Sequence, residues 1–198
     1  KELMGVTVPA VTASIAGSKL SSTGPLLITH WGMSGPAILR LSAWGAREIA
    51  AMNYTFTLRV DWTNGLGEQV LRERIEAFRA EHPKKHLANL CPVELPNRFW
   101  LYLLDRLELP STKLWEELGR RDRDRLIDAL TNARYAVRGR TTFKEEFVTA
   151  GGVALDEVDP ASLQSRLVPG LYFAGEVLDI DGITGGFNFQ AAWTTGHI

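Results

Sequence analysis

The sequence predicts an α+β fold in which a helical segment is inserted between two strand-rich flanks. Residues 54–62 alternate apolar and polar side chains, which is the period of a half-buried strand. Residues 66–80 and 97–107 instead place apolar side chains at helical spacing. A strand-like pattern returns at residues 133–142, after the helices. Strands, helices and strands again therefore follow one another along the chain.

The first flank is expected to hold strands and one helix. Residues 4–15 are rich in Val and Thr and predict a strand with Pro9 at an edge or a bulge. Residues 25–30 predict a short buried strand. A helix is expected to begin after Ser34, as N-cap, and to continue to about Ala51.

The middle of the chain predicts a small helical subdomain over residues 65–132. Two further short helices, at 111–118 and 122–132, join the two described above. The aromatic side chains of Phe99, Trp100 and Tyr102 are expected in the core of this subdomain, with a substrate-facing surface as the alternative.

The last third predicts strands at 146–153 and 170–174 and a helix at 189–198. The apolar strand over 170–174 ends at Gly175-Glu176, and a turn containing Gly182, Gly185 and Gly186 leads into the helix.

Composition excludes several classes of protein. The 198 residues carry 22 Lys plus Arg and 23 Asp plus Glu, a net charge of -1, which is not the footprint of a non-specific nucleic-acid binder. No apolar run approaches the roughly 18 residues of a membrane span. A single cysteine, Cys91, excludes an internal disulfide framework and a CxxC metal site, so we expect no metal and a reducing, cytoplasmic location.

The chemistry is expected near the carboxyl end of the 170–174 strand. In open α/β sheets ligands bind where strands end, and a helix N-terminus offers free backbone N–H groups to an electron-rich atom. Glu176 and the glycine-rich turn would form such a site. The alternative is a plain glycine turn with a solvated glutamate at its edge.

Three segments carry a family resemblance. LYFAGEVLDIDGITGGFNFQAAW, GPLLITHWGMSGPAIL and VTAGGV resemble the sequence blocks of the HI0933-type (YhiN or BaiN-like) family of NAD(P)/FAD-dependent oxidoreductases. The family's opening GxGxxG fingerprint is absent from the sequence.

The resemblance implies an architecture and cofactors. Residues 1–64 and 133–166 would form a β-barrel-like subdomain, residues 65–132 an inserted all-α subdomain, and residues 167–198 the strand-turn-helix end of a Rossmann-like FAD-binding domain. FAD would be the cofactor and NAD(P)H the electron donor. The expected partners are a small-molecule substrate and the missing N-terminal segment of the same FAD domain, with no nucleic acid and no membrane.

The resemblance also implies roles for individual residues. Glu176 would accept hydrogen bonds from the ribityl chain, and Asp181 and Gly182 would lie beside the isoalloxazine or the diphosphate. Backbone N–H groups at the helix start would face the flavin pyrimidine edge. The cofactor-binding set implied by the resemblance is Gly175, Glu176, Asp181, Gly182, Thr184, Gly185, Gly186, Phe187 and Asn188.

Other candidates are weaker. His30 could donate a proton near the flavin, or could be a packed histidine at a strand end. Residues 149–152 could approach the flavin or form a β-bulge, and Asp179 could cap a turn. Cys91 has no partner His or Asp nearby in sequence and is not expected to be a nucleophile. Arg120, Arg121, Arg123 and Arg125 are expected to form a solvated helix start, with an anion site as the alternative.

Together these observations predict part of an FAD-dependent oxidoreductase that reduces a small organic acceptor, inactive without the rest of its FAD domain. A non-catalytic binding module is the alternative. Nucleic-acid modification would need a basic face, and the net charge of -1 counts against it.

Overall fold

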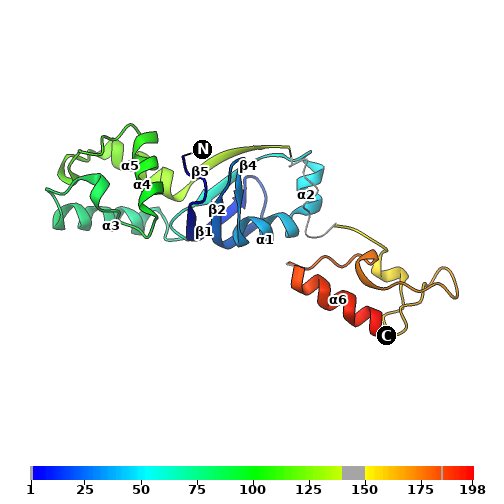
Figure 1. Cartoon of the computed structure of the whole chain (residues 1–198). Coiled ribbons are helices and arrows are strands. Elements are labelled where there is room, and N and C mark those ends of the chain that lie inside the picture. Colours follow the sequence, from blue (N-terminus) through cyan, green and yellow to red (C-terminus); the bar gives the residue numbers. More distant parts are fainter. Residues whose placement is uncertain (1, 140–149, 184) are drawn as a thin grey trace. The chain divides into compact units, whose positions relative to one another are not determined.

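The computed structural model describes residues 2–139, 150–183 and 185–198 as a mixed α/β protein (Figure 1). The chain forms two compact units: Lys1–Leu41 with Phe56–Val137, and Ser42–Thr55 with Arg138–Ile198. Each unit is described by itself below.

The first unit is built on a curled antiparallel sheet of five strands. The strand order is β3-β2-β1-β4-β5, so β1 is flanked on both sides. The register of β1 with β2 shifts between Val8 and Val11, which places Pro9 at a bulge. A bulge was one of the two positions predicted for this proline. The strands are β1 (Thr7–Ile15), β2 (Ser21–Ile28), β3 (Met33–Ser34), β4 (Thr55–Asp61) and β5 (Ala133–Arg138).

Alternating side chains of the central strands make the core of the sheet. Val8, Val11 and Ala13 of β1 are fully buried, and Val60 of β4 is buried beside them. Val60 pairs with Ala13 across the two strands. The alternation that predicted a strand over 54–62 is therefore confirmed by β4.

The described residues form six α-helices. The single helix predicted to end at about Ala51 is wrong in one respect, because it breaks at Gly45 into two helices. Ser34 lies in β3 instead of capping a helix. The helices are α1 (Pro36–Trp44), α2 (Ala46–Ala51), α3 (Glu68–Glu81), α4 (Asn97–Arg106), α5 (Arg120–Thr131) and α6 (Gly185–His197).

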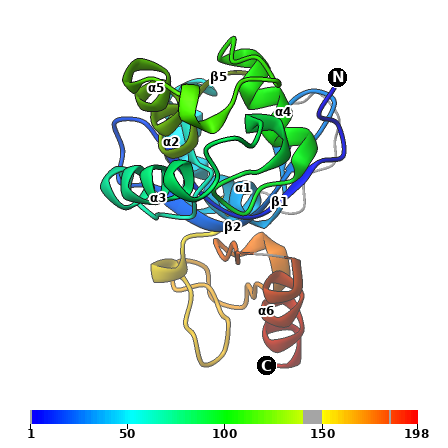
Figure 2. The same ribbon diagram turned by 90° about the vertical axis from the view of Figure 1, so that its left-hand side faces the viewer.

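Helices α3, α4 and α5 gather at one end of the first unit (Figures 1 and 2). Two indoles of this helical part, Trp100 and Trp115, are fully buried. The rings of Trp100 and Trp115 are stacked with centroids 6.4 Å apart. Trp100 Nε1 donates to the Leu87 carbonyl at 2.7 Å, which satisfies the buried indole N–H. The helix expected over 111–118 is shorter than predicted, a 3-10 turn at Trp115–Glu117.

Trp62 joins the sheet to these helices. It follows β4, is 1% exposed, and its backbone N–H donates to the Leu130 carbonyl of α5 at 2.8 Å. Its ring lies 4.3 Å from that of Phe99 and 6.2 Å from that of Tyr135. The end of β4, α4, α5 and β5 are thereby held together.

The second unit has a much smaller core. Val158, Leu163 and Leu178 form its buried cluster. The strand predicted over 170–174 is wrong: Tyr172 is 60% exposed and only bridges Gln164. Among the residues that the structure describes, backbone pairing of this segment is confined to such single bridges, and no described strand forms a continuous ladder with it.

The last third of the chain contains an isolated parallel bridge and two short 3-10 turns. Residues 146–149, half of the strand predicted over 146–153, lie outside the described residues, and in the other half Val153 bridges Leu178 in parallel. Short 3-10 turns occur at Leu155–Glu157 and Gly175–Val177. Within the described ranges, no helix has the length and apolar character needed to cross a membrane.

A candidate cofactor turn at the start of the last helix

The candidate site lies in the second unit, where hydrogen bonds tie Gly175 and Gly182 to side chains of α6. The backbone N–H of Gly175 donates to Thr195 Oγ1 at 2.9 Å, and that hydroxyl donates to the Ala191 carbonyl at 2.8 Å. Gly175 has a φ of 79°, a conformation that favours glycine. One threonine of α6 thus fixes the turn that carries Glu176.

A second tie holds the turn before α6. Gly182 N–H donates to Asn188 Oδ1 at 2.6 Å, and Asn188 Nδ2 lies 3.5 Å from the Gly182 carbonyl. A Cβ at Gly182 would lie 2.6 Å from Phe187 Cβ, so only glycine fits there. The predicted cofactor residues Gly182 and Asn188 therefore shape the turn, in which the Asn188 side chain accepts a hydrogen bond from the Gly182 backbone.

The start of α6 offers open backbone. Space beside Gly186 is empty within 4 Å of where a Cβ would be, and the first turn holds no acidic side chain. Glu176 and Asp181 are exposed, and Phe187 is 64% exposed. Thr184 lies outside the described residues.

This set of groups is chemically suited to a flavin. Exposed carboxylates can accept hydrogen bonds from ribityl hydroxyls, and N–H groups at a helix start can donate to electron-rich ring atoms. The structure describes eight of the nine residues expected at the cofactor: Gly175, Glu176, Asp181, Gly182, Gly185, Gly186, Phe187 and Asn188. Of these it brings Gly182 into contact with Phe187 and Asn188.

The neighbouring residues Gly152 and Asp179 serve the fold. A Cβ at Gly152 would lie 2.6 Å from the Val177 carbonyl oxygen, so this glycine permits close backbone packing. Asp179 Oδ2 accepts from Arg47 Nη2 at 2.6 Å, and this hydrogen bond raises the pKa of Arg47. The carboxylate of Asp179 is thus engaged in an ion pair.

His30 and Cys91 belong to the first unit. His30 is exposed and stacks on Trp31 with ring centroids 5.5 Å apart, so it is not the packed histidine considered as an alternative. Burial raises the pKa of Cys91 to about 12, which leaves little thiolate at neutral pH and supports the expectation that it is not a nucleophile.

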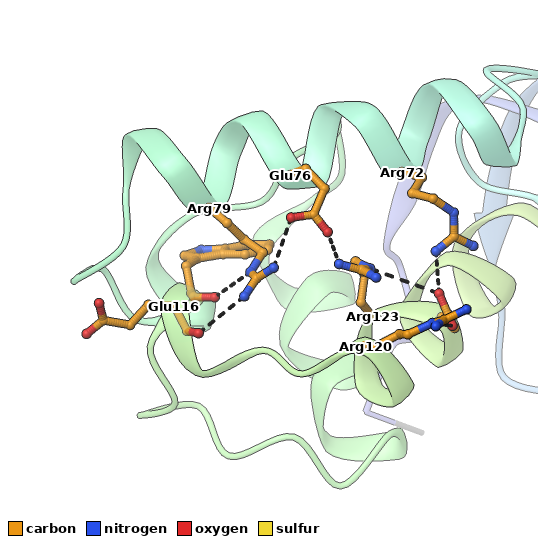
Figure 3. A network of polar contacts seen from close by, with 8 residues as sticks. Arg72, Glu76, Arg79, Glu116, Arg120 and Arg123 are labelled. Atoms are coloured by element: carbon orange, nitrogen blue, oxygen red, sulfur yellow. Dashed lines mark hydrogen bonds and ion pairs between the residues drawn. The ribbon is translucent and has the colours of Figure 1, made fainter.

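The arginines of α5 divide into two groups (Figure 3). Arg123 is 15% exposed and forms an ion pair with Glu76 of α3, and Arg72 of α3 pairs with Asp124. Arg79 extends this network by donating to the Trp115 carbonyl at 3.1 Å. These contacts hold α3 against α5, which neither of the two predictions for these arginines, a solvated helix start or an anion site, included.

Of the remaining arginines, Arg120 and Arg121 face solvent and Arg125 is half-buried beside Asp122. Arg120 is 88% exposed, 3.9 Å from Asp124, and Arg121 is also exposed. Arg125 lies 3.4 Å from Asp122. Sequence reasoning could not separate the two groups because the partners of Arg123 and Asp124 lie about fifty residues earlier in the chain.

The fold and this site define a class of protein: a curled antiparallel half-barrel with a three-helix segment, followed by a glycine turn and a helix with an open N-terminus. The chain belongs to a family described as HI0933-like protein barrel and H2TH domain, whose model matches residues 1–148. This membership confirms the resemblance read from the sequence motifs.

Three relatives show what the chain is similar to. A ribosomal RNA dihydrouridine synthase of Escherichia coli is 37% identical over 194 residues, which are 98% of this chain and 45% of that protein. A 3-dehydro-bile acid delta(4,6)-reductase of Clostridium scindens is 30% identical, over 98% of this chain and 48% of that protein. A ribosomal RNA dihydrouridine synthase of Haemophilus influenzae is 28% identical, over 98% and 45%. The chain spans about half the length of the curated relatives it matches.

These relatives correct two expectations. The expected function, part of an FAD-dependent reductase for a small organic acceptor or a non-catalytic binding module, is wrong because the similarity points to enzymes that modify ribosomal RNA. The expected absence of a nucleic-acid partner is wrong for the same reason. The net charge of -1 misled because it averages over the chain and hides exposed arginines grouped on one helix.

The expectation of a flavin is supported in its general form. The names of the relatives denote a reductase and synthases of a reduced uridine, which is chemistry that a flavin cofactor can supply.

Proposed function

We propose that this chain is the barrel, helical and cofactor-turn part of an enzyme that reduces uridine to dihydrouridine in ribosomal RNA. The observation that carries the proposal is the similarity to the E. coli ribosomal RNA dihydrouridine synthase, which runs through 98% of the chain at 37% identity. It therefore includes the cofactor turn beyond the 148 residues that the family model matches.

The reaction sets the requirements for the site. Dihydrouridine is uridine with a saturated C5–C6 bond, so the enzyme must deliver a hydride to one carbon and a proton to the other. A bound flavin, which we propose to be FAD reloaded by NADPH or NADH, supplies the hydride.

The residues of the turn have distinct tasks in this proposal. Glu176 accepts hydrogen bonds from the hydroxyls of the flavin side chain, and Asp181 lies near the linkage beyond it. Backbone N–H groups at Gly185 and Gly186 donate to the flavin ring and favour the negative charge that develops on its reduction. Asn188 and Thr195 hold the turn in shape through the hydrogen bonds to Gly182 and Gly175.

The division of the chain also enters the proposal. Residues 1–64 with 133–166 form the barrel part, residues 65–132 the helical insert, and residues 167–198 the end of a cofactor domain. The cytoplasmic location predicted from the cysteine count stays a prediction.

Complementation tests the function. An E. coli strain that lacks its ribosomal RNA dihydrouridine synthase would receive the protein at its full natural length, and dihydrouridine in ribosomal RNA would be measured by mass spectrometry. We expect the modification to return with the wild-type protein and to fall at least tenfold with Glu176→Ala. A modification that stays absent while the protein is folded and flavin-loaded would contradict the proposal.

A further inference from the structure

The first unit contains a polar cavity that none of the functions above uses. Its volume is about 300 Å³, and it lies where the ends of α4 and α5 meet the start of β5. This size is at the lower limit of small-molecule sites, which is enough for a single nucleobase. The polar and aromatic side chains of its wall are Tyr102, Arg106, Asp128, Asn132, Arg134 and Tyr135.

Two tyrosine side chains, Tyr102 and Tyr135, line the cavity, each with a flat apolar ring and a polar hydroxyl. Tyr102 and Tyr135 are both half-buried, and Tyr102 stacks on Phe99 with centroids 6.3 Å apart. Burial raises the pKa of Tyr135 to about 12, so its hydroxyl stays protonated and can donate at any physiological pH. An aromatic ring that is fixed by packing is a good stacking platform for a base.

An amide and a carboxylate on the same wall are already oriented. Asn132 Nδ2 donates to Asp128 Oδ1 at 3.0 Å, while Asn132 Oδ1 accepts from Arg59 Nε at 2.8 Å. These bonds fix the amide plane at the end of α5. The remaining donor and acceptor capacity of the pair can serve the edge of a base.

Two guanidinium groups at the cavity are exposed. Arg106 Nη1 reaches Tyr102 only at 3.5 Å, and among the described residues Arg134 forms no ion pair. With Asp128 as the one acidic wall residue, the cavity carries a net positive charge. Guanidinium groups bind phosphate through paired hydrogen bonds.

The positive surface continues along α5. A second, open hollow of about 620 Å³ is lined by Arg120, Arg121, Asp124, Arg125 and Asp128, so it shares Asp128 with the cavity. Arg121 and Arg125 lie one helical turn apart, about 6 Å along the axis. Asp124 is already paired with Arg72 of α3, which reduces its competition for these arginines.

We propose that this cavity binds one nucleotide of single-stranded RNA, with the base against Tyr102 and the phosphate between Arg106 and Arg134. The next phosphates of the strand run along α5 toward Arg125 and Arg121. The inference rests on the proposed function, because it names where the first unit holds the substrate RNA. A stacking ring, a fixed amide and two exposed guanidinium groups in one cavity match a nucleotide better than a protein surface.

RNA titration tests the proposal with the full-length protein and a labelled 20-nucleotide oligouridine. In Arg106→Gln/Arg134→Gln the dissociation constant should rise at least tenfold. The slope of log affinity against log salt should become shallower by about 1.4, the value for two lost phosphate contacts on a single strand. The control Arg74→Gln/Lys84→Gln removes the same charge from exposed positions that do not line the cavity, and should change the affinity less than threefold.

Two variants of Tyr102 separate stacking from folding. Tyr102→Phe keeps the ring and should bind RNA within twofold of wild type, whereas Tyr102→Ala should bind about tenfold more weakly. Thermal melts of all variants check that the first unit stays folded. If Tyr102→Ala lowers the melting temperature, ultraviolet crosslinking of 4-thiouridine RNA to the wild-type protein decides, with an adduct expected in the peptide that contains Tyr102.

Several results would overturn the proposal. If Arg106→Gln/Arg134→Gln and Arg74→Gln/Lys84→Gln lost the same RNA affinity, the net charge of the protein alone would explain binding. If Arg106→Gln/Arg134→Gln bound RNA as tightly as wild type, the cavity would not be an RNA site. Crosslinks that avoid α4, α5 and β5 would have the same meaning. In each case the proposed function would stand if the wild-type protein still made dihydrouridine. If the wild-type protein bound no RNA, the proposed function and the proposed RNA site would both be wrong.

Discussion

The two units differ in how many of their tryptophans they bury. Three of the four in the first unit, Trp62, Trp100 and Trp115, are at most 1% exposed, and Trp31 is 68% exposed. Both tryptophans of the second unit are exposed, Trp44 at 55% and Trp193 on α6 at 70%. Phe187 and Phe189 of α6 are also exposed, at 64% and 63%. The first unit therefore draws its stability from its own core, while the second holds its shape through a three-residue cluster and backbone ties such as Gly175 to Thr195.

The contrast gives each unit a different kind of weakness. A buried ring is surrounded by atoms that lose their contacts when it is removed, but an exposed ring has few contacts to lose. Stability should accordingly depend on side-chain volume in the first unit and on backbone geometry in the second.

The largest expected effect comes from exchanging tryptophans for alanine. Trp100→Ala removes a fully buried ring and orphans the Leu87 carbonyl, and should lower the free energy of unfolding by about 3–5 kcal/mol. Trp193→Ala should lower it by less than about 1 kcal/mol, because most of that ring is in water. Urea denaturation followed by circular dichroism measures both, and equal losses would contradict the contrast.

The next effect tests backbone geometry in the second unit. Gly182→Ala places a methyl group 2.6 Å from Phe187 Cβ and should destabilise the turn by about 1–3 kcal/mol. In the full-length protein it should reduce the flavin that copurifies, while the melting of the first unit stays unchanged. Gly196→Ala is the matched control, because the space beside Gly196 is open and this glycine is not among the proposed flavin-binding residues. Equal flavin loss in both variants would argue against the clash.

A smaller effect is expected from the clamp between α3 and α5 (Figure 3). Arg123→Met removes one of the two arginines that pair with Glu76 and leaves it with Arg79 of its own helix. It should lower the free energy of unfolding by about 1 kcal/mol, since Glu76 is 43% exposed and water screens the pair. Arg121→Met, on the outer face of the same helix, should have no measurable effect on unfolding. A double-mutant cycle with Glu76→Gln would give a coupling near zero if the ion pair contributes nothing.

The smallest effect is a pH dependence. A hydrogen bond from the Lys113 ammonium holds the pKa of Asp122 below its usual value, so the folded state favours the carboxylate. The resulting stabilisation is present at neutral pH and disappears as the pH falls through the lowered pKa. Denaturant midpoints of wild type and Asp122→Asn should therefore differ at pH 7 and approach each other as acid protonates the carboxylate of the folded protein.

The second unit offers the matching case. Hydrogen bonds from the Ser162 hydroxyl and the Ala161 N–H lower the pKa of Asp159, so the sign of its pH dependence is the same. In wild type, proteolysis of the loop around Asp159 should be faster at low pH than at pH 7. In Asp159→Asn it should be as fast at pH 7 as at low pH. A wild-type loop whose cleavage is independent of pH would contradict the assignment.

Local patterns predicted much of the first unit and little of the second. The alternation in residues 54–62 and the apolar spacing of 97–107 correspond to β4 and α4 because those segments bury one face against a core. Residues 170–174 are equally apolar, yet they form no strand, because pairing requires a neighbouring strand that the pattern itself cannot supply.

The candidate sites show the same limit. The glycine turn was visible because it is contiguous, and Gly182 does stand where a Cβ would clash. The cavity was not visible, since Arg106 and Arg134 are 28 residues apart in sequence and meet only through the packing of α4, α5 and β5. Net charge, an average over the chain, could not report this local grouping of arginines.

The most direct test of this account measures flavin content and RNA affinity on the same preparations of full-length wild type, Glu176→Ala and Arg106→Gln/Arg134→Gln. We expect Glu176→Ala to lose bound flavin while it keeps its affinity for the oligouridine. We expect Arg106→Gln/Arg134→Gln to lose affinity for the oligouridine while it keeps its flavin. If both variants lost both properties, or if neither lost either, the separation of cofactor turn and RNA cavity would be contradicted.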